Sequence, residues 1–408
     1  MKQIFIFNFT LIMLAFMIVG CSKIDTVTSE KITIVPSIIP EKAITIAPQE
    51  TTPTTTPTIS PAITPTAEPI PASYETRASE ILKSMTLEEK IGQMFFVRCR
   101  NEQAISDIKT FHLGGYILFA EDFEGKSRDE LKNTLKSYQE ISKIPLLIGV
   151  DEEGGDVNRL SKYLQFRSVP FLSPQSLYQE GGFDLVISDT VEKAKLLKSL
   201  GINVNLAPVC DVSTDSDDFI YNRSFGKNAT NTAEYVKTIV SAMNKQNIGC
   251  TLKHFPGYGN NVDTHTGIAI DNRSYESFVK SDFIPFQAGI DAGAGSILVS
   301  HNIVTCMDEI LPASLSPAVH KILRDELGFN GVIMTDDMIM DAIKQYTNDK
   351  EAAVLAIEAG NDLIVATNFD VQIPAVIAAV DNQIIDEERI NESVMRVLIW
   401  KLSLGIIS

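Results

Sequence analysis

The chain is poor in the residues that hold metals or crosslinks. Its 408 residues include five histidines and five cysteines, and no two cysteines form a CxxC metal knuckle or a compact disulfide framework. Wide spacing favours buried, apolar roles for Cys99, Cys210, Cys250 and Cys306. Positive charge is also scarce, since 35 basic residues stand against 52 acidic ones, for a net charge of −17. That balance argues against a nucleic-acid partner.

Long apolar runs are absent except at the start of the chain. The run from Ile4 to Gly20 follows Lys2 and precedes Cys21, which is typical of a secretion signal. Residues 18–21 resemble a bacterial lipobox, and this resemblance implies that residues 1–21 are a lipoprotein signal peptide, cleaved before a lipidated Cys21. An uncleaved anchor and an ordinary signal peptide are the alternatives. All three place the remainder outside the cytoplasm, and the first anchors it to the membrane through a lipid.

Residues 22–73 are dense in threonine and proline. Such a segment buries too little apolar area to offset the entropy that it loses on ordering, and proline keeps it extended. We therefore expect a disordered stalk, followed by one globular domain over residues 74–408.

Eight short apolar runs alternate with amphipathic, helix-like segments in the globular part. The runs are 94–99, 114–119, 144–150, 202–209, 248–255, 295–301, 331–337 and 362–367. Continuously apolar strands are typical of a parallel sheet covered by helices. Eight such units predict a single (β/α)₈ barrel. A doubly wound open sheet is the alternative, but it would often carry a Gly-rich phosphate fingerprint after the first strand, and none is present.

Polar side chains follow four of these runs. They are Asp151, Lys253 with His254, Ser300 with His301, and Asp336 with Asp337. In a barrel, chemistry is concentrated where strands end and βα loops begin. The pattern therefore predicts one site at the carboxyl ends of the strands.

Two features of this site suggest a reaction. Asp336 follows an apolar strand, so it is held rigidly and can act as a nucleophile, while Asp337 is expected to cap the next helix. Asp263 and His265 lie two residues apart in a Gly-rich loop, where the carboxylate can orient the imidazole as a general acid/base. A structural Asp–His contact, or a metal site with His254, is the alternative for this loop. A nucleophilic carboxylate opposite a proton donor fits glycoside hydrolysis by double displacement.

Four ordered motifs resemble the β-N-acetylhexosaminidase branch of glycoside hydrolase family 3. They are DEEGGDVNR at 151–159, NRSFG at 222–226, KHFPGYGNNVDTH at 253–265 and TDD at 335–337. The resemblance implies a (β/α)₈ barrel and an exo-acting, retaining β-N-acetylglucosaminidase that needs no metal or organic cofactor. Its expected substrates are cell-wall muropeptides, released during peptidoglycan turnover, or chitin-derived fragments. The expected partners are this carbohydrate and, through the lipid, the membrane; we expect a monomer.

The same resemblance assigns roles to individual residues. Asp336 would be the nucleophile, and His265 the acid/base, oriented by Asp263. The residues expected to bind hydroxyls of the first sugar are Asp151, Arg159, Arg223, Lys253 and His254.

Two residues depart from the family pattern. Tyr258 stands where the family usually has histidine, which predicts a changed contact on the leaving-group side. Asp156 stands where it often has arginine, which removes a positive charge near the sugar. Three alternative functions stay open: a β-glucosidase or β-xylosidase of the same family, a phosphorolytic variant, and a non-catalytic wall-binding lipoprotein.

Overall fold

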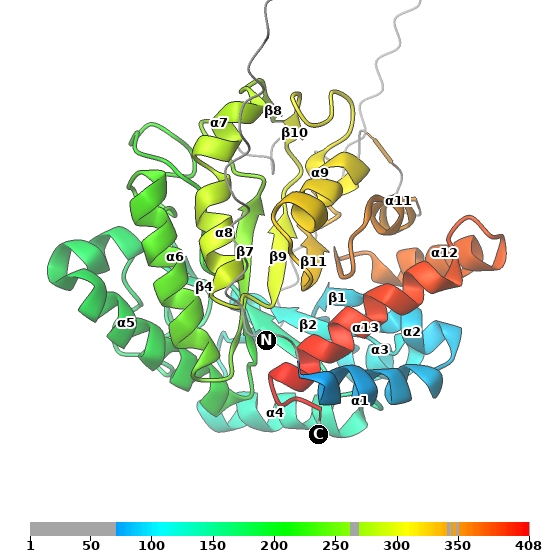
Figure 1. The fold of residues 1–408 in the computed structure, drawn as a ribbon. Coiled ribbons are helices and arrows are strands. Elements are labelled where there is room, and N and C mark those ends of the chain that lie inside the picture. The colour runs from blue at the N-terminus through cyan, green and yellow to red at the C-terminus, as the bar shows by residue number, and fades with distance from the viewer. Residues whose placement is uncertain (1–70, 262–268, 341–342, 344–345, 348–350, 408) are drawn as a thin grey trace, which may run out of the picture. The chain divides into compact units, whose positions relative to one another are not determined.

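The computed structural model describes residues 71–261, 269–340, 343, 346–347 and 351–407. Their core is an eight-stranded, all-parallel sheet in the order β11-β9-β7-β6-β3-β2-β1-β12 (Figure 1). The strands are β1 (Phe95–Arg98), β2 (Gly115–Leu118), β3 (Leu147–Val150), β6 (Val204–Asn205), β7 (Gly249–Phe255), β9 (Ser296–Val299), β11 (Val332–Thr335) and β12 (Ile364–Ala366). The edge strands meet through a parallel bridge between Met334 and Leu363, so the sheet closes into a barrel. The predicted (β/α)₈ fold is confirmed, and the open-sheet alternative is wrong.

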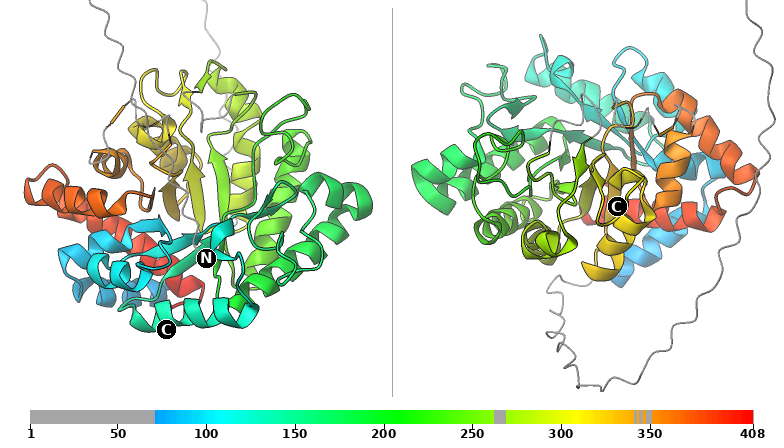
Figure 2. Two further views of the ribbon diagram at one scale, coloured as in Figure 1. Left: turned by 180° about the vertical axis from the view of Figure 1, so that it is seen from behind. Right: turned by 90° about the horizontal axis from the view of Figure 1, so that it is seen from above.

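Helices surround the strands, as the view from above shows (Figure 2, right). They are α1 (Ala72–Lys83), α2 (Leu87–Gln93), α3 (Ala104–Phe111), α4 (Arg128–Ile141), α5 (Pro174–Leu200), α6 (Ala229–Asn244), α7 (Tyr275–Lys280), α8 (Phe283–Asp291), α9 (Pro317–Lys321), α11 (Ala352–Ala359), α12 (Phe369–Asp381) and α13 (Glu387–Ser403). The first and last of these, α1 in blue and α13 in red, lie side by side (Figure 1). None of the helices in the described part of the chain combines the length and apolar composition needed to cross a membrane.

Short elements decorate the barrel. A hairpin of β4 (Glu152–Gly154) and β5 (Val157–Asn158) follows β3, and β8 (Ile270–Asp271) pairs with β10 (Ile303–Val304). The remaining turns are η1 (Ala120–Asp122), η2 (Ala313–Leu315) and the π-helical η3 (Ile322–Glu326). The hairpin and the β8–β10 pair both follow barrel strands at their carboxyl ends.

Successive side chains of each strand point to opposite faces of the sheet, and both faces are covered, which explains the continuously apolar sequence of the strands. In β1, Phe96 packs in one hydrophobic cluster with Leu147 and Val332, whereas Phe95 and Val97 pack in a second, larger cluster. The first contains residues from several strands, as expected inside a barrel, and the second contains the helix-facing residues. Both faces are buried, so no position on the strand can be polar without a partner.

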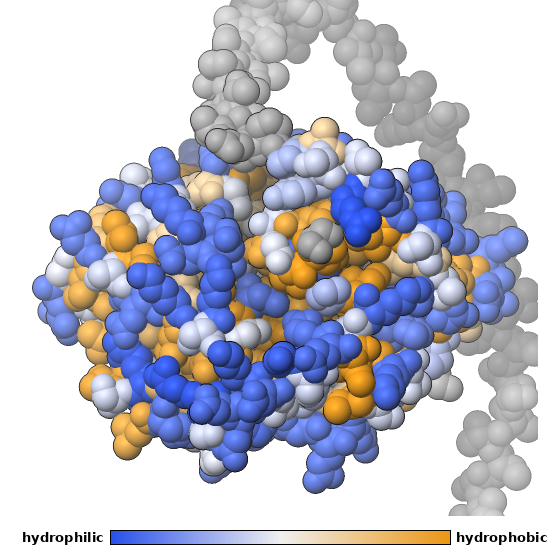
Figure 3. Space-filling model, turned by 90° about the horizontal axis from the view of Figure 1, so that it is seen from below, coloured by the Kyte–Doolittle hydropathy of each residue, from blue (hydrophilic) through white to orange (hydrophobic). Residues whose placement is uncertain are grey.

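The surface and the cysteines follow ordinary burial rules, with one exception. Seen from below, the molecule is largely hydrophilic, with hydrophobic side chains in separate areas (Figure 3).

Cys99, Cys210 and Cys250 are buried free thiols, as predicted. Cys306 is exposed, so the prediction of burial was wrong there. It lies in the turn after β10, which is outside the apolar layers that bury the other three.

A buried carboxylate stabilises the junction of β11 and β12, where the barrel closes. Asp362, fully buried before β12, accepts hydrogen bonds from the backbone N–H of Ile333 (3.0 Å) and from Arg396 Nη1 (3.0 Å). Arg324 and Arg389 approach the same carboxylate. One anion thus ties β11 and β12 to η3 and α13.

We expect Asp362→Ala to destabilise the fold by about 3 kcal/mol, because it leaves three partly buried guanidinium groups without their anion. The measurement is the free energy of unfolding in urea. Asp370→Ala is the matched control, since its half-exposed pair with Arg100 should contribute less than about 1 kcal/mol. Equal effects of the two variants would contradict the role given to Asp362.

Candidate active site

A cavity of about 330 Å³ opens among the carboxyl ends of the strands. Six of the eight predicted catalytic and sugar-binding residues line it: Asp151, Arg159, Arg223, Lys253, His254 and Asp336. They come from β3, the β4–β5 hairpin, the segment after β6, β7 and the end of β11. Asp263, His265 and the lipidation residue Cys21 lie outside the described residues. The structure therefore brings together residues up to 185 positions apart (Asp151 to Asp336) at one end of the barrel.

A network of buried ion pairs forms one wall. Lys253 Nζ lies 2.6 Å from Asp151 Oδ1 and 2.7 Å from Glu153 Oε1. Arg223 donates two hydrogen bonds to the Glu153 carboxylate, from Nη2 at 2.7 Å and from Nε at 3.0 Å. Burial alone would raise the pKa of Glu153, but Lys253 and Arg223 outweigh it and hold that pKa well below its usual range. Glu153 is therefore an anion at all working pH values, and it fixes both cations.

His254 is held in a single tautomer. Its Nε2 lies 3.2 Å from Arg223 Nη2, which can only donate, so Nε2 accepts. Its Nδ1 therefore carries the hydrogen and donates to Asp211 Oδ2 at 2.7 Å. Asp211 also accepts from the backbone N–H groups of His254 (3.2 Å) and Tyr258 (2.7 Å). Three N–H donors thus converge on one buried carboxylate.

The opposite wall combines the predicted nucleophile with apolar side chains. Asp336 follows β11, and its Oδ1 accepts from the backbone N–H of Asp337 at 2.9 Å. Asp337 accepts from Ile339 N (3.1 Å) and from the Thr367 hydroxyl (2.8 Å), and burial raises its pKa. The apolar residues beside them are Ile117, Leu206, Leu298, Ile339, Met340 and Val365. A sugar in this cavity would meet both charged and apolar side chains.

Arg159 reaches the cavity from the β4–β5 hairpin. The fully buried Glu152 accepts the backbone N–H groups of Arg159 (3.0 Å) and Leu160 (2.8 Å), which fixes the end of the hairpin. The Arg159 and Arg98 guanidinium groups lie 5.8 and 4.4 Å from the centre of the Phe119 ring. The buried Nε of Arg159 has no hydrogen-bond partner among the described residues.

Arg273 braces the chain on both sides of residues 262–268. Its guanidinium binds Asp271 (2.7 Å) and Asp282 (2.9 Å) and donates to the Gly257 carbonyl (3.2 Å). Asn261 Nδ2 also donates to Asp271, at 2.9 Å. The described residues on either side of 262–268 are therefore held by one buried charge cluster.

The structure places the two residues that depart from the family pattern outside the lining of the cavity, and their expected effects on the substrate stay predictions. Tyr258 is 3% exposed, packs with Val209 and Ile220, and does not line the cavity, because its ring turns into the interior beside His254. Asp156 is exposed at the hairpin turn and lines a neighbouring hollow with Asn222, not the cavity itself.

Two of the polar residues predicted at the strand ends, Ser300 and His301, do not belong to the site. His301 contacts Ser314 Oγ (2.7 Å) and the Asp337 carbonyl (3.1 Å), and neither it nor Ser300 lines the cavity. Conversely, sequence reasoning missed Glu153 and Asp211. Asp211 follows the apolar run 202–209, so the strand-end rule itself could have found it.

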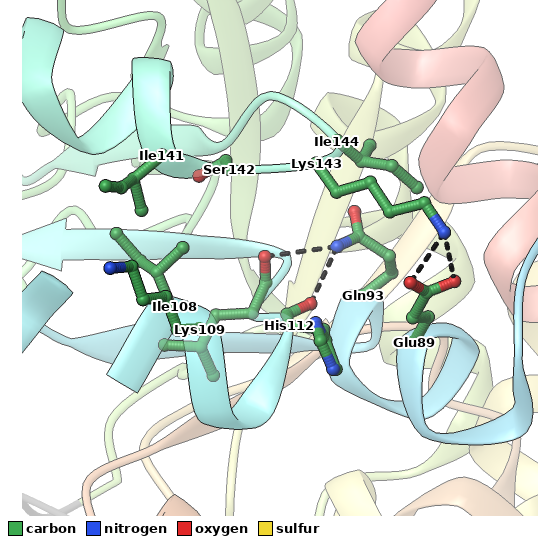
Figure 4. A pocket seen from close by; sticks show the side chains of 10 residues that line it. Glu89, Gln93, Ile108, Lys109, His112, Ile141, Ser142, Lys143 and Ile144 are labelled. Atoms are coloured by element: carbon green, nitrogen blue, oxygen red, sulfur yellow. Dashed lines mark hydrogen bonds and ion pairs between the residues drawn. The ribbon is translucent and has the colours of Figure 1, made fainter. Parts of the chain in front are cut away.

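A second hollow, of about 200 Å³, lies at the amino-terminal ends of β1 to β3 (Figure 4). There Lys143 pairs with Glu89 at 2.6 Å, and Gln93 donates to the carbonyls of His112 and Leu113. These polar groups satisfy one another and stabilise the bottom of the barrel. Chemistry in this architecture belongs to the other end.

The comparison with protein families decides the assignment. Residues 86–399 match the model of the glycosyl hydrolase family 3 N terminal domain. The chain belongs to glycosyl hydrolase family 3. The predicted family and enzyme class, a glycoside hydrolase, are thereby confirmed.

Individual relatives agree with this family. The chain is 32% identical over 261 residues to a beta-hexosaminidase of Nitrosomonas eutropha, which covers 63% of this chain and 74% of that protein. It is 29% identical to beta-hexosaminidase A of Pseudoalteromonas piscicida, over 73% of this chain and 54% of the other. Among solved structures, a family 3 beta-N-acetylglucosaminidase from Paenibacillus sp. str. FPU-7 superimposes with a TM-score of 0.75 at 29% identity, covering 79% of this chain and 63% of that one. The chain thus spans about half to three quarters of these proteins.

We expect Asp211→Asn to lower kcat/KM on an N-acetylglucosaminide by roughly 10- to 100-fold. Either orientation of the amide points an N–H at another N–H, and an unsatisfied buried donor costs about 1–3 kcal/mol. Asp308→Asn is the control, because Asp308 also accepts two backbone N–H groups, those of Ile310 and Leu311, but does not line the cavity. The nitrogen chemical shifts of His254 report the tautomer. Unchanged shifts and unchanged kinetics would contradict the positioning role of Asp211.

Proposed function

We propose that the chain is an exo-acting, retaining β-N-acetylglucosaminidase that removes terminal N-acetylhexosamine from cell-wall or chitin-derived fragments. One observation carries the proposal: a single cavity holds the strand-end carboxylate Asp336 opposite a preorganised cluster of Asp151, Arg223, Lys253 and His254. The names of the relatives, beta-hexosaminidase and beta-N-acetylglucosaminidase, support the substrate class.

The charged wall suits the hydroxyl groups of a terminal sugar. Forked donors and carboxylate acceptors bind vicinal hydroxyls, and here they are held in place before the substrate arrives. We place the non-reducing end of the sugar against this wall of buried ion pairs. This placement favours exo-cleavage.

The proposed reaction proceeds in two steps. In the first, an Asp336 carboxylate oxygen attacks the anomeric carbon, and the bond to the leaving-group oxygen breaks as His265 gives that oxygen its proton. In the second, water attacks the same carbon, His265 takes the water's proton, and Asp336 is released. Asp263 orients His265 in both steps. Two inversions give net retention.

The test compares aryl β-N-acetylglucosaminide with aryl β-glucoside as substrates of the full chain. We expect turnover of the N-acetyl sugar, loss of activity in Asp336→Ala, and in His265→Ala a loss that is largest for poor leaving groups, because only these need a proton. His112→Asn, at the opposite end of the barrel, is the control. Faster hydrolysis of the glucoside, or unchanged activity in His265→Ala, would contradict the proposal.

We also propose that the enzyme is tethered outside the cytoplasm, through a lipid on Cys21 and the Thr/Pro-rich stalk. The apolar run before Cys21 and the composition of residues 22–73 support this placement. We expect wild-type protein in the membrane fraction, labelled by a fatty-acid analogue, and Cys21→Ser unlabelled. Label that persists in Cys21→Ser would refute lipidation at this residue.

A further inference from the structure

His301 lies behind the cavity wall, next to the turn that carries Asp336. It is fully buried just after β9. Its Nε2 lies 3.1 Å from the carbonyl oxygen of Asp337, and its Nδ1 lies 2.7 Å from Ser314 Oγ. A carbonyl oxygen only accepts hydrogen bonds, so Nε2 carries a hydrogen and donates it. In the neutral ring, Nδ1 then accepts from the Ser314 hydroxyl group. The imidazole therefore links η2 to the residue that follows the proposed nucleophile.

The turn after β11 is held on two sides. The backbone N–H of Asp336 donates to the Val299 carbonyl on β9 at 3.1 Å, and that of Met338 donates to the Val365 carbonyl on β12 at 3.0 Å. His301 adds a side-chain contact from the β9 side, to the carbonyl that lies between these two N–H groups in the chain. The turn is thus fixed by both neighbouring strands and by one imidazole.

The Asp336 carboxylate takes its orientation from the same turn. Its Oδ1 accepts from the backbone N–H of Asp337 at 2.9 Å. This N–H and the carbonyl that binds His301 belong to one residue, so a shift of Asp337 would disturb both hydrogen bonds. A misplacement of about 1 Å in a reacting group can cost roughly 100-fold in rate. The contact with His301 is therefore able to influence the attack on the sugar.

His301 is itself attached to a rigid framework. The backbone N–H of Ser314 donates to the Ser300 carbonyl at 3.0 Å, and the Ser314 carbonyl accepts from Asn361 Nδ2 at 2.8 Å. Asn361 precedes Asp362, the carboxylate that stabilises the junction of β11 and β12. All of these residues are fully buried. The framework connects the imidazole to the junction at which the barrel closes.

We infer that His301 is a positioning residue for the proposed nucleophile: through the Asp337 carbonyl, it keeps the Asp336 carboxylate oriented for attack on the anomeric carbon. His301 does not line the cavity, so it acts through Asp337 and not by touching the sugar. An apolar side chain of similar size would fill the same space but would not donate to the Asp337 carbonyl. The inference rests on the proposed function, which gives the attack to Asp336.

The experiment measures two quantities on the full chain. The kcat/KM for an aryl β-N-acetylglucosaminide reports the attack by Asp336, and the Kd of N-acetylglucosamine reports binding by the charged wall. His301→Leu is expected to lower kcat/KM by about 10- to 100-fold and to leave the Kd unchanged, because only the nucleophile is displaced. In His301→Gln an amide N–H can still reach the Asp337 carbonyl, so most of the lost activity is expected to return.

His320→Leu is the matched control. His320 is also a buried histidine, and its Nδ1 lies 2.8 Å from the Ser316 carbonyl, but it is on α9 and does not line the cavity. Its kcat/KM per folded molecule is expected to equal that of wild type. A milder variant, Ser314→Ala, removes only the hydroxyl group that holds the ring, and we expect it to lower kcat/KM by about two- to fivefold.

Three results would overturn the positioning role: unchanged kcat/KM in His301→Leu, an equal loss in His301→Gln, or a parallel weakening of N-acetylglucosamine binding. If His301→Leu does not fold, wild-type kcat/KM in Ser314→Ala would overturn it instead. The proposed function fails separately, if wild type does not turn over the aryl N-acetylglucosaminide or if Asp336→Ala keeps wild-type turnover.

Discussion

The site depends on a requirement for charge balance inside the barrel. Lys253 is buried and Arg223 is only partly exposed, and two cations so placed repel each other unless anions stand between them. Glu153 supplies that anion, with an oxygen 2.7 Å from each cation, and Asp151 supplies a second. The four charges cancel. Hence the wall can be rigid and dry and still present charged donors and acceptors to a sugar.

Much of the surrounding structure holds these charges in position. Glu153 is on β4. The carboxylate of the neighbouring Glu152 accepts hydrogen bonds from the backbone that follows the hairpin. His254 is tied to Asp211, and Asp211 to the start of the next loop. The ion pairs thus connect β3, the hairpin, the segment after β6 and β7. A substitution at any of them reaches the sugar through another residue's geometry.

The barrel and the strand-end residues could be predicted because each rests on local sequence. A strand buried on both faces must be continuously apolar, and the first polar residue after it must lie at the mouth. This logic found Asp151, Lys253, His254 and Asp336. It could not find Glu153, because two adjacent glutamates in DEEGG look alike until distant cations are placed. It could not find Asp362 either, whose partners come from η3 and α13. Cys306 was wrongly predicted to be buried because loops do not follow strand periodicity.

Helices show the same division between local and long-range information. The helices α4 and α13 have 14 and 17 residues, whereas α3 has only eight and α12 contains Pro374. Their helical state is imposed by the strands they cover, since propensity alone is weak.

The pocket and its rim therefore carry different kinds of information. Strand-end residues have positions dictated by barrel register, so a family resemblance transfers them well and predicts the reaction. Residues such as Asp156 lie on the surrounding loops, where one substitution changes the surface without disturbing the barrel. In the proposed function the pocket binds the terminal sugar and the surrounding loops bind the remainder of the substrate, so related enzymes can share a mechanism and differ in what they cleave.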